Sequence, residues 1–296
     1  MIISKIKGGL GNQLFMYAAG RSVAKRTGAE FKLDTTWYDE VRRHRFAHEG
    51  HARREFSLGL FNISATIATN DEIRQFTLPQ NMPRLLYGIL RKFCRPHHVY
   101  EEGKGDFRLE DITEPAYLKG YWTSPEILET VRDELRTELV FRDGVLDDCG
   151  EFEQRIRSAI NPVCVHVRRG DYADKLDYGA LLGYLERSLK TLKEKLQGAR
   201  LQLFVFSDDI PWCRENVKAE DCDVCFVDNP PAIAAKSQND FHLMTLCRHF
   251  IIPSSTFSFW AAWLATNEPT KNARDAHVVI SQREKLPVGW LKGMKL

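Results

Sequence analysis

The stretch from His166 to Tyr172 reads His-Val-Arg-Arg-Gly-Asp-Tyr and directly follows the apolar run Val163–Val165. Ligands of α/β proteins bind where strands end and loops begin, so we expect this stretch to form the wall of an anion site. Arg168 and Arg169 carry permanent charges, and their planar guanidinium groups match the geometry of phosphate oxygens. The predicted ligand is a diphosphate, and a solvated arginine pair in a surface turn is the alternative.

Two more residues of this stretch are candidates for a role. His166 is a candidate donor to a base or a phosphate, although a lone histidine in a strand is more often a satisfied core residue. Asp171 either orients Arg168 or Arg169 through a salt bridge or acts as a base. The salt bridge is favoured, because a carboxylate beside arginines has a lowered pKa and makes a poor base.

A glycine-rich loop spans Gly8–Gln13 and reads Gly-Gly-Leu-Gly-Asn-Gln. Glycines let the backbone approach a ligand closely, and the following helix adds a partial positive charge at its N-terminus. The loop also matches part of a dinucleotide fingerprint, with Asp34 at the end of the next strand, but the third glycine is absent. A purely structural turn is the alternative. The candidate binding residues here are Gly9, Gly11, Asn12 and Gln13.

A hydroxyl-rich loop, Ser254–Ser258, follows the apolar run Phe250–Ile252 and opens a helix. Hydroxyl groups and backbone N–H groups at a helix start bind phosphate. A plain N-cap is the alternative, but four hydroxyls in five positions exceed what capping needs. The candidate binding residues are Ser255, Thr256 and Ser258.

Acidic residues stand at two further places. The pair Asp208 and Asp209 follows the apolar run Leu201–Phe206, and Asp240 precedes Phe241–Met244. The pair lacks the alternating Asp-x-Asp form that holds a metal in nucleotide-sugar enzymes, so Asp208 is predicted to contact a nucleobase or ribose. Asp240 is predicted to contact the nucleotide or to cap a helix.

Composition and spacing exclude several classes of function. A formal net charge of +2 over 296 residues gives no case for nucleic-acid binding. The seven cysteines form an odd set without framework spacing, which indicates reduced thiols in a cytoplasmic protein. Cys222 and Cys225 have the spacing of half a zinc site, but the sequence has no second pair at a suitable distance. His44, His48 and His51 resemble a metal site only superficially, and contact with an acceptor or simple exposure to solvent is favoured.

We expect neither a secretory signal nor a membrane span. The first residues, Met1–Lys7, reach a charge almost at once and contain no long apolar region. The apolar stretch Phe250–Ala265 is interrupted by Pro253 and several hydroxyl residues, so it fails as a span. The predicted location is cytoplasmic, and peripheral contact with a membrane is left open.

Apolar periodicity predicts an α/β fold. The chain is predicted to start with a strand at Ile2–Ile6, a helix at Asn12–Arg26 and a strand at Phe31–Leu33. The region Trp37–Glu114 is predicted to be irregular substructure that lines a cleft, with helical periodicity only at Met82–Phe93.

From Asn161 onward, apolar strands alternate with amphipathic helices such as Tyr184–Leu196, which implies a parallel, doubly wound sheet. A charged helix, Glu151–Ser158, precedes this part, so the predicted domains are 1–160 and 161–296. The predicted strands are Val163–Val167, Leu201–Phe206, Val224–Val227, Phe250–Ile252 and Val278–Ile280.

Four of these segments together resemble the α1,2-fucosyltransferases. They are Gly8–Phe15, His166–Tyr172, Ser207–Asp209 and Ser254–Ala261, and their order and spacing agree over nearly the whole chain. The resemblance implies a GT-B type fold with two Rossmann-like domains facing a central cleft, the first on the acceptor side and the second binding the donor. It implies inverting transfer of L-fucose from GDP-β-L-fucose to the 2-hydroxyl of a terminal galactose, with no metal or other cofactor.

The resemblance also implies roles for single residues. These are Arg168 and Arg169 for the diphosphate, His166 and Asp240 near guanine, and Gly11, Asn12 and Ser255–Ser258 closing over the phosphates. Cations at the departing phosphate supply the stabilisation that a metal would otherwise give. Asp171 is nominated as the base that takes the acceptor proton, and a base-free, dissociative mechanism is the alternative.

Three other functions stay open at this point. A nicotinamide-dependent oxidoreductase would rest on Gly9, Gly11 and Asp34. A second alternative is a fucosyltransferase-like enzyme of another linkage or donor, acting on a peptide or a chitin oligomer, for example. A lectin-like module would bind without turnover. The favoured partners are GDP-fucose and a galactose-terminated glycan of membrane-associated glycan biosynthesis, with no nucleic acid.

Overall fold

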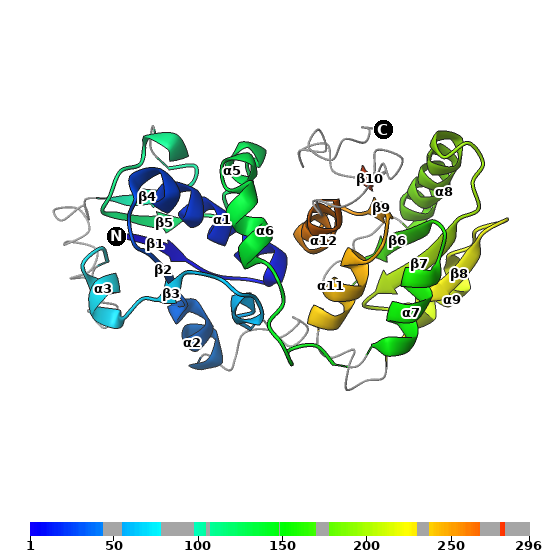
Figure 1. The fold of residues 1–296 in the computed structure, drawn as a ribbon, viewed down its shortest axis with the longest axis horizontal. Helices are drawn as coiled ribbons and strands as arrows, with labels where there is room; N and C mark the ends of the chain where they lie inside the picture. Colours follow the sequence, from blue (N-terminus) through cyan, green and yellow to red (C-terminus); the bar gives the residue numbers. More distant parts are fainter. Residues whose placement is uncertain are drawn as a thin grey trace. The chain divides into compact units, whose positions relative to one another are not determined.

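The structure, a computed structural model, describes residues 1–43, 55–77, 98–104, 107–147, 149–169, 178–229, 237–266 and 279–281. Within these ranges the chain forms two compact units, Met1–Arg142 and Asp143–Leu296. Each unit contains a parallel sheet and its own helices (Figure 1). The predicted α/β class, with two Rossmann-like domains, is therefore confirmed within each unit.

The first unit is built on a parallel sheet with the strand order β3-β2-β1-β5-β4. Its strands are β1 (Ile2–Lys5), β2 (Phe31–Asp34), β3 (Thr66–Ile67), β4 (Val99–Glu101) and β5 (Ala116–Lys119). The helices described in it are α1 (Leu10–Thr27), α2 (Thr36–Arg43), α3 (Asn70–Arg74), α5 (Pro125–Thr130) and α6 (Arg132–Glu138), with 3-10 turns at Leu58–Leu60 and Leu109–Asp111. The predicted β1-α1-β2 start is confirmed, whereas β3, β4 and β5 were not predicted.

Helix α1 packs closely on the sheet, and most of its residues are buried. Leu14 and Phe15 are fully buried, as are their neighbours through Ala19, which is why the helix shows little amphipathic contrast. Gly20 allows this approach, because a Cβ at that position would lie 2.2 Å from the ring of Phe31 in β2. Gly28 then ends the helix in the left-handed conformation, with φ of 70°.

The second unit has the strand order β10-β9-β6-β7-β8, again with parallel pairing throughout. Its strands are β6 (Pro162–Val167), β7 (Gln202–Ser207), β8 (Asp223–Phe226), β9 (His249–Ile252) and β10 (Val279–Ser281). The helices described in it are α7 (Gly150–Ser158), α8 (Tyr178–Lys195), α9 (Ile210–Asn216), α11 (Ser237–Thr245) and α12 (Thr256–Thr266). All five predicted strands are confirmed, with ends shifted by one residue at most places.

Helix α8 is the amphipathic helix predicted at Tyr184–Leu196, and it starts earlier than predicted. Leu185 and Leu192 are buried in the core of the second unit, and Leu189 and Leu196 pack against that core. The predicted helix at Met82–Phe93 lies outside the described residues.

The boundary between the units lies at Arg142, earlier than the predicted junction near residue 160. The intervening segment belongs to the second unit through side-chain contacts. Asn239 donates to Asp147 Oδ2 at 2.9 Å and accepts from the Asp147 backbone N–H at 3.1 Å. On α7, Glu153 Oε2 lies 3.3 Å from His242 Nε2 of α11. The predicted domain ranges are corrected accordingly, because local composition could not reveal these distant partners.

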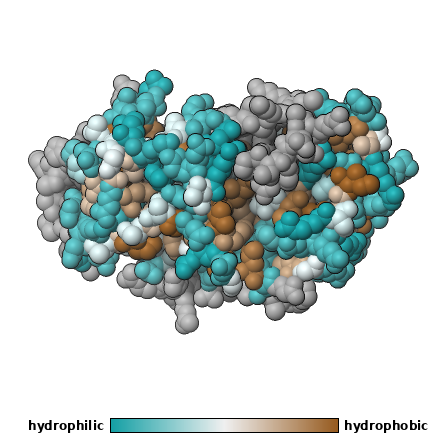
Figure 2. Space-filling view, in the orientation of Figure 1, coloured by the Kyte–Doolittle hydropathy of each residue, from teal (hydrophilic) through white to brown (hydrophobic). Residues whose placement is uncertain are grey.

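The described surface matches the charged, nearly neutral composition. The face shown in Figure 2 is mostly hydrophilic, with apolar residues scattered among polar ones. Across the described parts of the chain, every helix is too short or too polar to cross a membrane.

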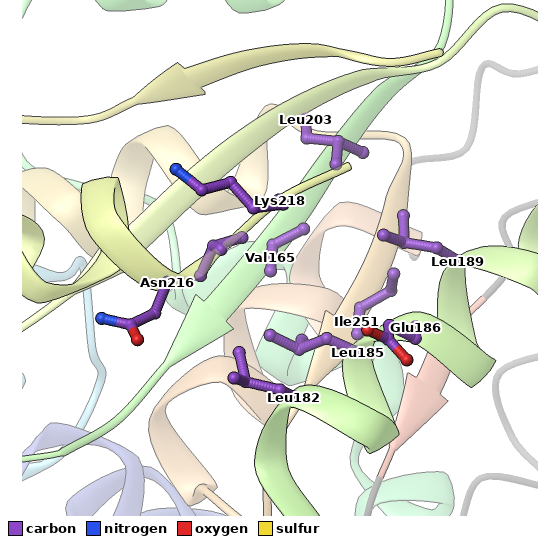
Figure 3. A pocket seen from close by; sticks show the side chains of 10 residues that line it. Val165, Leu182, Leu185, Glu186, Leu189, Leu203, Asn216, Lys218 and Ile251 are labelled. Carbon is purple, nitrogen blue, oxygen red and sulfur yellow. The ribbon is translucent and has the colours of Figure 1, made fainter. Parts of the chain in front are cut away.

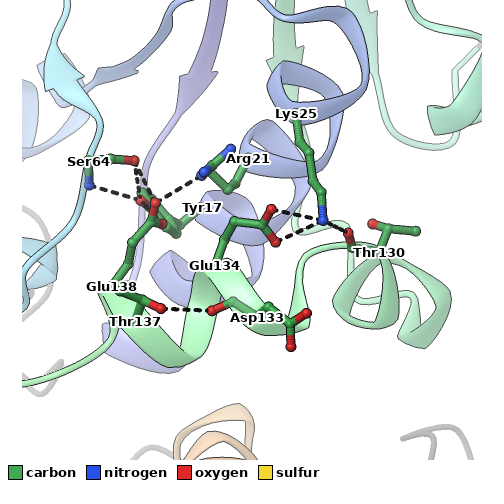
Figure 4. Close-up of polar contacts among 9 residues, drawn as sticks. All are labelled: Tyr17, Arg21, Lys25, Ser64, Thr130, Asp133, Glu134, Thr137 and Glu138. Atoms are coloured by element: carbon green, nitrogen blue, oxygen red, sulfur yellow. Dashed lines mark hydrogen bonds and ion pairs between the residues drawn. The ribbon is translucent and has the colours of Figure 1, made fainter.

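A buried carboxylate ties α6 to α1 in the first unit (Figure 4). Glu138 accepts from the Tyr17 hydroxyl at 2.6 Å, from Arg21 Nε at 3.0 Å and from Ser64 Oγ at 2.7 Å. Its side chain is 10% exposed. Such a carboxylate stabilises the fold only with all its donors in place, because an unpaired buried charge is costly. The more exposed Glu134 pairs with Lys25 between the same two helices, at 2.8 Å.

We predict that Glu138→Ala lowers the free energy of unfolding by about 3 kcal/mol, since the buried Tyr17 hydroxyl and two further donors lose their acceptor. Glu134→Ala, the matched control on the same helix, is expected to cost less than about 1 kcal/mol, because an exposed pair contributes little. Urea denaturation followed by circular dichroism measures both values. Equal losses in the two variants would contradict the structural role given to Glu138.

Candidate active site

The carboxyl ends of the second sheet bring the predicted motifs to one edge. β6 leads on to β7 and β8 on one side of the sheet, whereas β9 leads on to β10 on the other. The loops after β6 and β9 therefore diverge between two neighbouring strands, which is where open α/β sheets bind ligands. Arg168 and Arg169 follow β6, and Ser254–Ser258 follows β9. The structure thus places the arginine pair and the hydroxyl-rich loop at the same crevice.

Arg169 is held by neighbours from the end of β7. Its guanidinium pairs with the carboxylate of Asp209 and lies 4.5 Å from the centre of the Trp212 ring. Its backbone N–H donates to Asp208 Oδ1 at 2.8 Å. Asp209 also caps α9 by accepting from the Trp212 backbone N–H at 3.0 Å. The side chain of Arg169 is 14% exposed, so its cation is fixed in place at the edge of the sheet.

These contacts give Asp208 and Asp209 a different role from the predicted one. Asp208 was predicted to contact the nucleotide, yet one of its oxygens holds the backbone of Arg169. Trp212 was not predicted at all. Its position three residues after an N-capping aspartate, behind Ile210 and Pro211, was the available signal. The pair Asp208 and Asp209 therefore orients the arginine loop, a role that the sequence reading had given to Asp171. Asp171 itself lies outside the described residues.

His166 stands on β6 as a neutral imidazole. Its ring is half-buried and lies 6.2 Å from the ring of Phe257, centre to centre. Burial, followed by the nearby charge of Arg168, lowers its pKa to about 3. Its Nδ1 atom is buried and meets no hydrogen-bond partner among the described residues. The alternative of a satisfied core histidine is thus not what the described structure shows.

Two hydroxyl groups after β9 are also buried. Ser255 and Ser258 are 2% and 0% exposed, and within the described ranges neither Oγ atom meets a hydrogen-bond partner. The Ser255 carbonyl accepts from the Phe259 backbone N–H at 3.1 Å, so Ser255 precedes the first turn of α12. Backbone N–H groups of a first helical turn point away from the helix and attract anions. This geometry suits a phosphate group.

Asp240 lies in the first turn of α11, near the end of β8. Burial raises its pKa from 3.8 to about 6, and a hydrogen bond from Asn229 Nδ2 at 2.9 Å partly opposes that rise. Asn229, which is 7% exposed, follows β8 and was missed by the sequence reading. Its place after a strand end is the same signal that identified the other loops.

The glycine loop of the first unit has a more structural role than predicted. Gln13 is fully buried, and its amide donates to the carbonyls of Gly8 and Glu55 and accepts from the Ser57 backbone N–H. Gln13 therefore fixes the loop and has no amide group left for a substrate. Gly8 needs its φ of 75°, whereas Gly9 precedes α1 in an extended conformation. Asn12 lies half-buried in the first turn of α1.

Asp34 does not serve the dinucleotide role considered from the sequence. The residue is 1% exposed, and its carboxylate accepts from the Thr36 backbone N–H at 2.8 Å and from the Tyr117 hydroxyl. A ribose-binding carboxylate has to face the ligand. The oxidoreductase alternative therefore loses the residue on which it rested.

A cavity under α8 lies away from these motifs and does not suit a nucleotide. This cavity of about 110 Å³ lies between α8 and the sheet and is lined by apolar side chains such as Val165, Leu185 and Ile251 (Figure 3). Ligand pockets usually span roughly 300 Å³ or more. We regard this space as a packing gap under α8.

Cysteines and histidines form no metal site in the described part of the chain. Six cysteines are free thiols there, and five of them are buried. Across the described residues, His, Cys, Asp and Glu side chains form no group of three that could hold a metal ion. Cys94 and the histidines His44, His48 and His51 lie outside these residues.

Comparison with known proteins identifies the family. The sequence model of glycosyl transferase family 11 matches residues 100–286, which include β6 to β10 and the candidate-site loops of the second unit. This chain is a member of glycosyl transferase family 11. The predicted resemblance is thereby confirmed at the family level.

Proteins of known activity resemble this family 11 protein over different lengths. An α1,2-colitosyltransferase from Escherichia coli is 28% identical over 89% of this chain and 87% of its own length. A galactoside α-(1,2)-fucosyltransferase 2 from Rattus norvegicus is 34% identical over 54% of this chain and 49% of its own length. The crystal structure of fucosyltransferase NodZ from Bradyrhizobium has 18% identity and a TM-score of 0.45, covering 90% of this chain and 92% of that one.

We predict that His166 stays uncharged at every pH above about 4, because its pKa lies near 3. The unfolded chain binds a proton at this position below about pH 6.5, which the folded chain does not, so the group's contribution to stability falls as the pH drops from 6.5 towards 3. Imidazole nitrogen chemical shifts, with His166→Phe to assign the signal, measure the charge state. A signal from His166 that titrates near 6.5 would contradict the buried, neutral histidine.

Proposed function

We propose that this protein is a glycosyltransferase that moves L-fucose from GDP-β-L-fucose to the 2-hydroxyl of a terminal galactose, with inversion. The observation that carries the proposal is a set of three buried polar atoms at the β6–β9 crevice, in His166, Ser255 and Ser258, for which the described residues offer no partner. Buried polar groups of native proteins are nearly always satisfied, so these atoms suit a polar ligand. The adjacent arginines make an anionic ligand the favoured one.

Within this proposal the second unit binds the donor. Arg168, the Ser255 and Ser258 hydroxyls, Thr256 and the start of α12 hold the diphosphate. Asp240 accepts from the N–H groups of guanine, and His166 donates to or accepts from the nucleotide as a neutral imidazole. Gly9, Gly11 and Asn12 remain proposed contacts to the donor through their backbone and amide groups. Arg169, fixed by Asp209 and Trp212, supplies a second cation at the departing phosphate.

The reaction itself is a single displacement. The galactose 2-hydroxyl oxygen forms a bond to C1 of fucose while the bond between C1 and the β-phosphate oxygen breaks, and GDP leaves with the electron pair. The positive charge that develops on the sugar and the negative charge on the departing phosphate both need stabilisation, and the two arginines supply it for the phosphate. The hydroxyl proton passes to a base, for which Asp171 remains the candidate, or to solvent after a dissociative step.

A colitose donor is the second candidate, motivated by the colitosyltransferase among the relatives. Colitose lacks the 3-hydroxyl of fucose, and a site that hydrogen-bonds this hydroxyl discriminates strongly against the deoxy sugar. Incubation with GDP-fucose or GDP-colitose and a panel of β-galactosides, with NMR of the product linkage, tests both donors. Transfer of fucose in an α1,2 linkage supports the proposal. Transfer of colitose alone overturns the donor, and binding without turnover, or binding of NAD instead of GDP, overturns the function.

We predict that Arg169→Lys lowers kcat by roughly a hundredfold, equivalent to about 3 kcal/mol of barrier, because a point charge replaces a planar fork. Arg214→Lys is the matched control, since Arg214 also pairs with an aspartate, Asp228, and lies 5.2 Å from the centre of an aromatic ring, Phe226. The control is expected to keep normal turnover. Steady-state kinetics with GDP-fucose measures both, and near-normal turnover of Arg169→Lys would refute the role of the pair.

We predict that the affinity for GDP falls as the pH drops below about 6, because Asp240 takes up a proton there and ceases to accept from guanine. Asp240→Asn should bind GDP more weakly at pH 8 and lack this part of the pH dependence. The variant also controls for titration of the phosphate, which both proteins share. Calorimetric titration from pH 5 to pH 8 measures the difference, and parallel curves for the two proteins would remove Asp240 from the guanine site.

A further inference from the structure

The first sheet contains its own ligand-binding position, which the proposed donor site does not use. β1 leads on to β2 and β3 on one side, whereas β5 and β4 lie on the other, so the loops after β1 and β5 diverge between neighbouring strands. This is the same topological feature that marks the donor crevice in the second unit. Lys7 follows β1, and Gly120, Tyr121 and Trp122 follow β5.

Side chains from both loops meet at this position. Lys7 Nζ lies 4.5 Å from the centre of the Tyr121 ring. The Tyr121 backbone N–H donates to Glu102 Oε2, after β4, at 2.7 Å. Tyr121 is nevertheless 40% exposed, one of the few large hydrophobic side chains exposed to this degree in the described structure. A cation, a carboxylate and an open aromatic ring therefore converge at the carboxyl edge of three neighbouring strands.

The backbone and the indole of the next residue add independent signs of a site. Trp122 has a φ of 51°, a conformation that bulky residues rarely adopt and that clusters at functional sites. Its side chain is 7% exposed, and its indole Nε1 is buried with no acceptor among the residues that the structure describes. The indole lies at the Gly120 turn, where an added Cβ would stand 3.1 Å from Trp122 Cε2 and 2.4 Å from Glu102 Cβ.

We infer that Lys7, Glu102, Tyr121 and Trp122 form the subsite for the terminal galactose ring of the acceptor, an inference that rests on the proposed function. A pyranose ring offers a face of C–H groups that packs on an aromatic ring, and hydroxyl groups at its edge. Glu102 accepts from sugar hydroxyls, while Lys7 and the Trp122 indole donate to them. The exposed Glu102 carboxylate disfavours a diphosphate here, so the occupant is the uncharged acceptor.

This subsite only partly overlaps the region expected to bind the acceptor. From the sequence, acceptor contacts were expected in the irregular stretch Trp37–Glu114, in which no motif identifies single residues. Glu102 lies within that stretch, Tyr121 and Trp122 lie just after it, and Lys7 lies far before it. They meet only because β1 and β5 pair in the sheet.

The test compares Tyr121→Ala, Tyr121→Phe and Lys7→Met with the unaltered protein in fucose transfer to methyl β-galactoside. We expect Tyr121→Ala to raise the KM of the acceptor about tenfold, as the loss of an aromatic packing surface implies. The KM of GDP-fucose and its slow hydrolysis without acceptor should stay within about twofold of normal. Tyr121→Phe keeps the ring and should behave as the unaltered protein, and Lys7→Met should raise the acceptor KM less than Tyr121→Ala does. Ile160→Ala, which truncates a residue that is 78% exposed in the second unit, is the control.

Saturation-transfer NMR with methyl β-galactoside adds a readout that needs no turnover, and the signal should weaken in Tyr121→Ala and persist in Ile160→Ala. An unchanged acceptor KM and an unchanged NMR signal in Tyr121→Ala would overturn the subsite. A rise in the KM of GDP-fucose instead would assign these residues to the donor. Failure of the unaltered protein to fucosylate or bind any β-galactoside would overturn the proposed function itself, which separates the two failures.

Discussion

The site depends on one topological constraint, that the first strand of each unit lies in the middle of its parallel sheet. β1 has β2 and β5 as neighbours, and β6 has β7 and β9. All carboxyl ends of a parallel sheet lie at one edge. The loops that follow two neighbouring strands lead to opposite sides only where the strand order changes direction. Each unit therefore offers one crevice, and the residues best suited to bind a ligand stand at both. No single motif would produce this arrangement without the strand order.

Polar satisfaction separates the residues that hold the loops from those available to a ligand. Gln13 and Asp34 look like ligand-binding residues in the sequence, yet their side chains are satisfied within the first unit. His166, Ser255 and Ser258 present buried atoms for which the described residues supply no partner. Arg169 does both, because its ion pair with Asp209 orders the loop and also keeps a cation at the edge of the sheet. A preorganised cation of this kind suits a reaction in which negative charge develops on a leaving phosphate.

The sequence predicts the second unit better than the first, for physical reasons. Strands β6, β7 and β9 are buried on both faces and appear as continuous apolar runs, and α8 shows a clear apolar stripe. β3 and β4 are short, β3 is exposed and β4 is half-buried, and they exist through pairing with β2 and β5, which no local pattern reveals. The motif positions of the donor site were predicted because they follow strand ends. Their partners Asn229 and Trp212 were missed, since a hydrogen bond or a ring contact between loops leaves no trace in local spacing.

The central claim, that the crevice between β6 and β9 holds the diphosphate of the donor, is tested most directly by a crystal structure of the protein with GDP bound. The account predicts phosphate oxygens within hydrogen-bond distance of Arg168 and of the hydroxyls or backbone N–H groups that start α12, with Asp240 at the guanine. A diphosphate bound at the β1–β5 edge of the first sheet, or a nucleotide that contacts neither loop of the second unit, would contradict it.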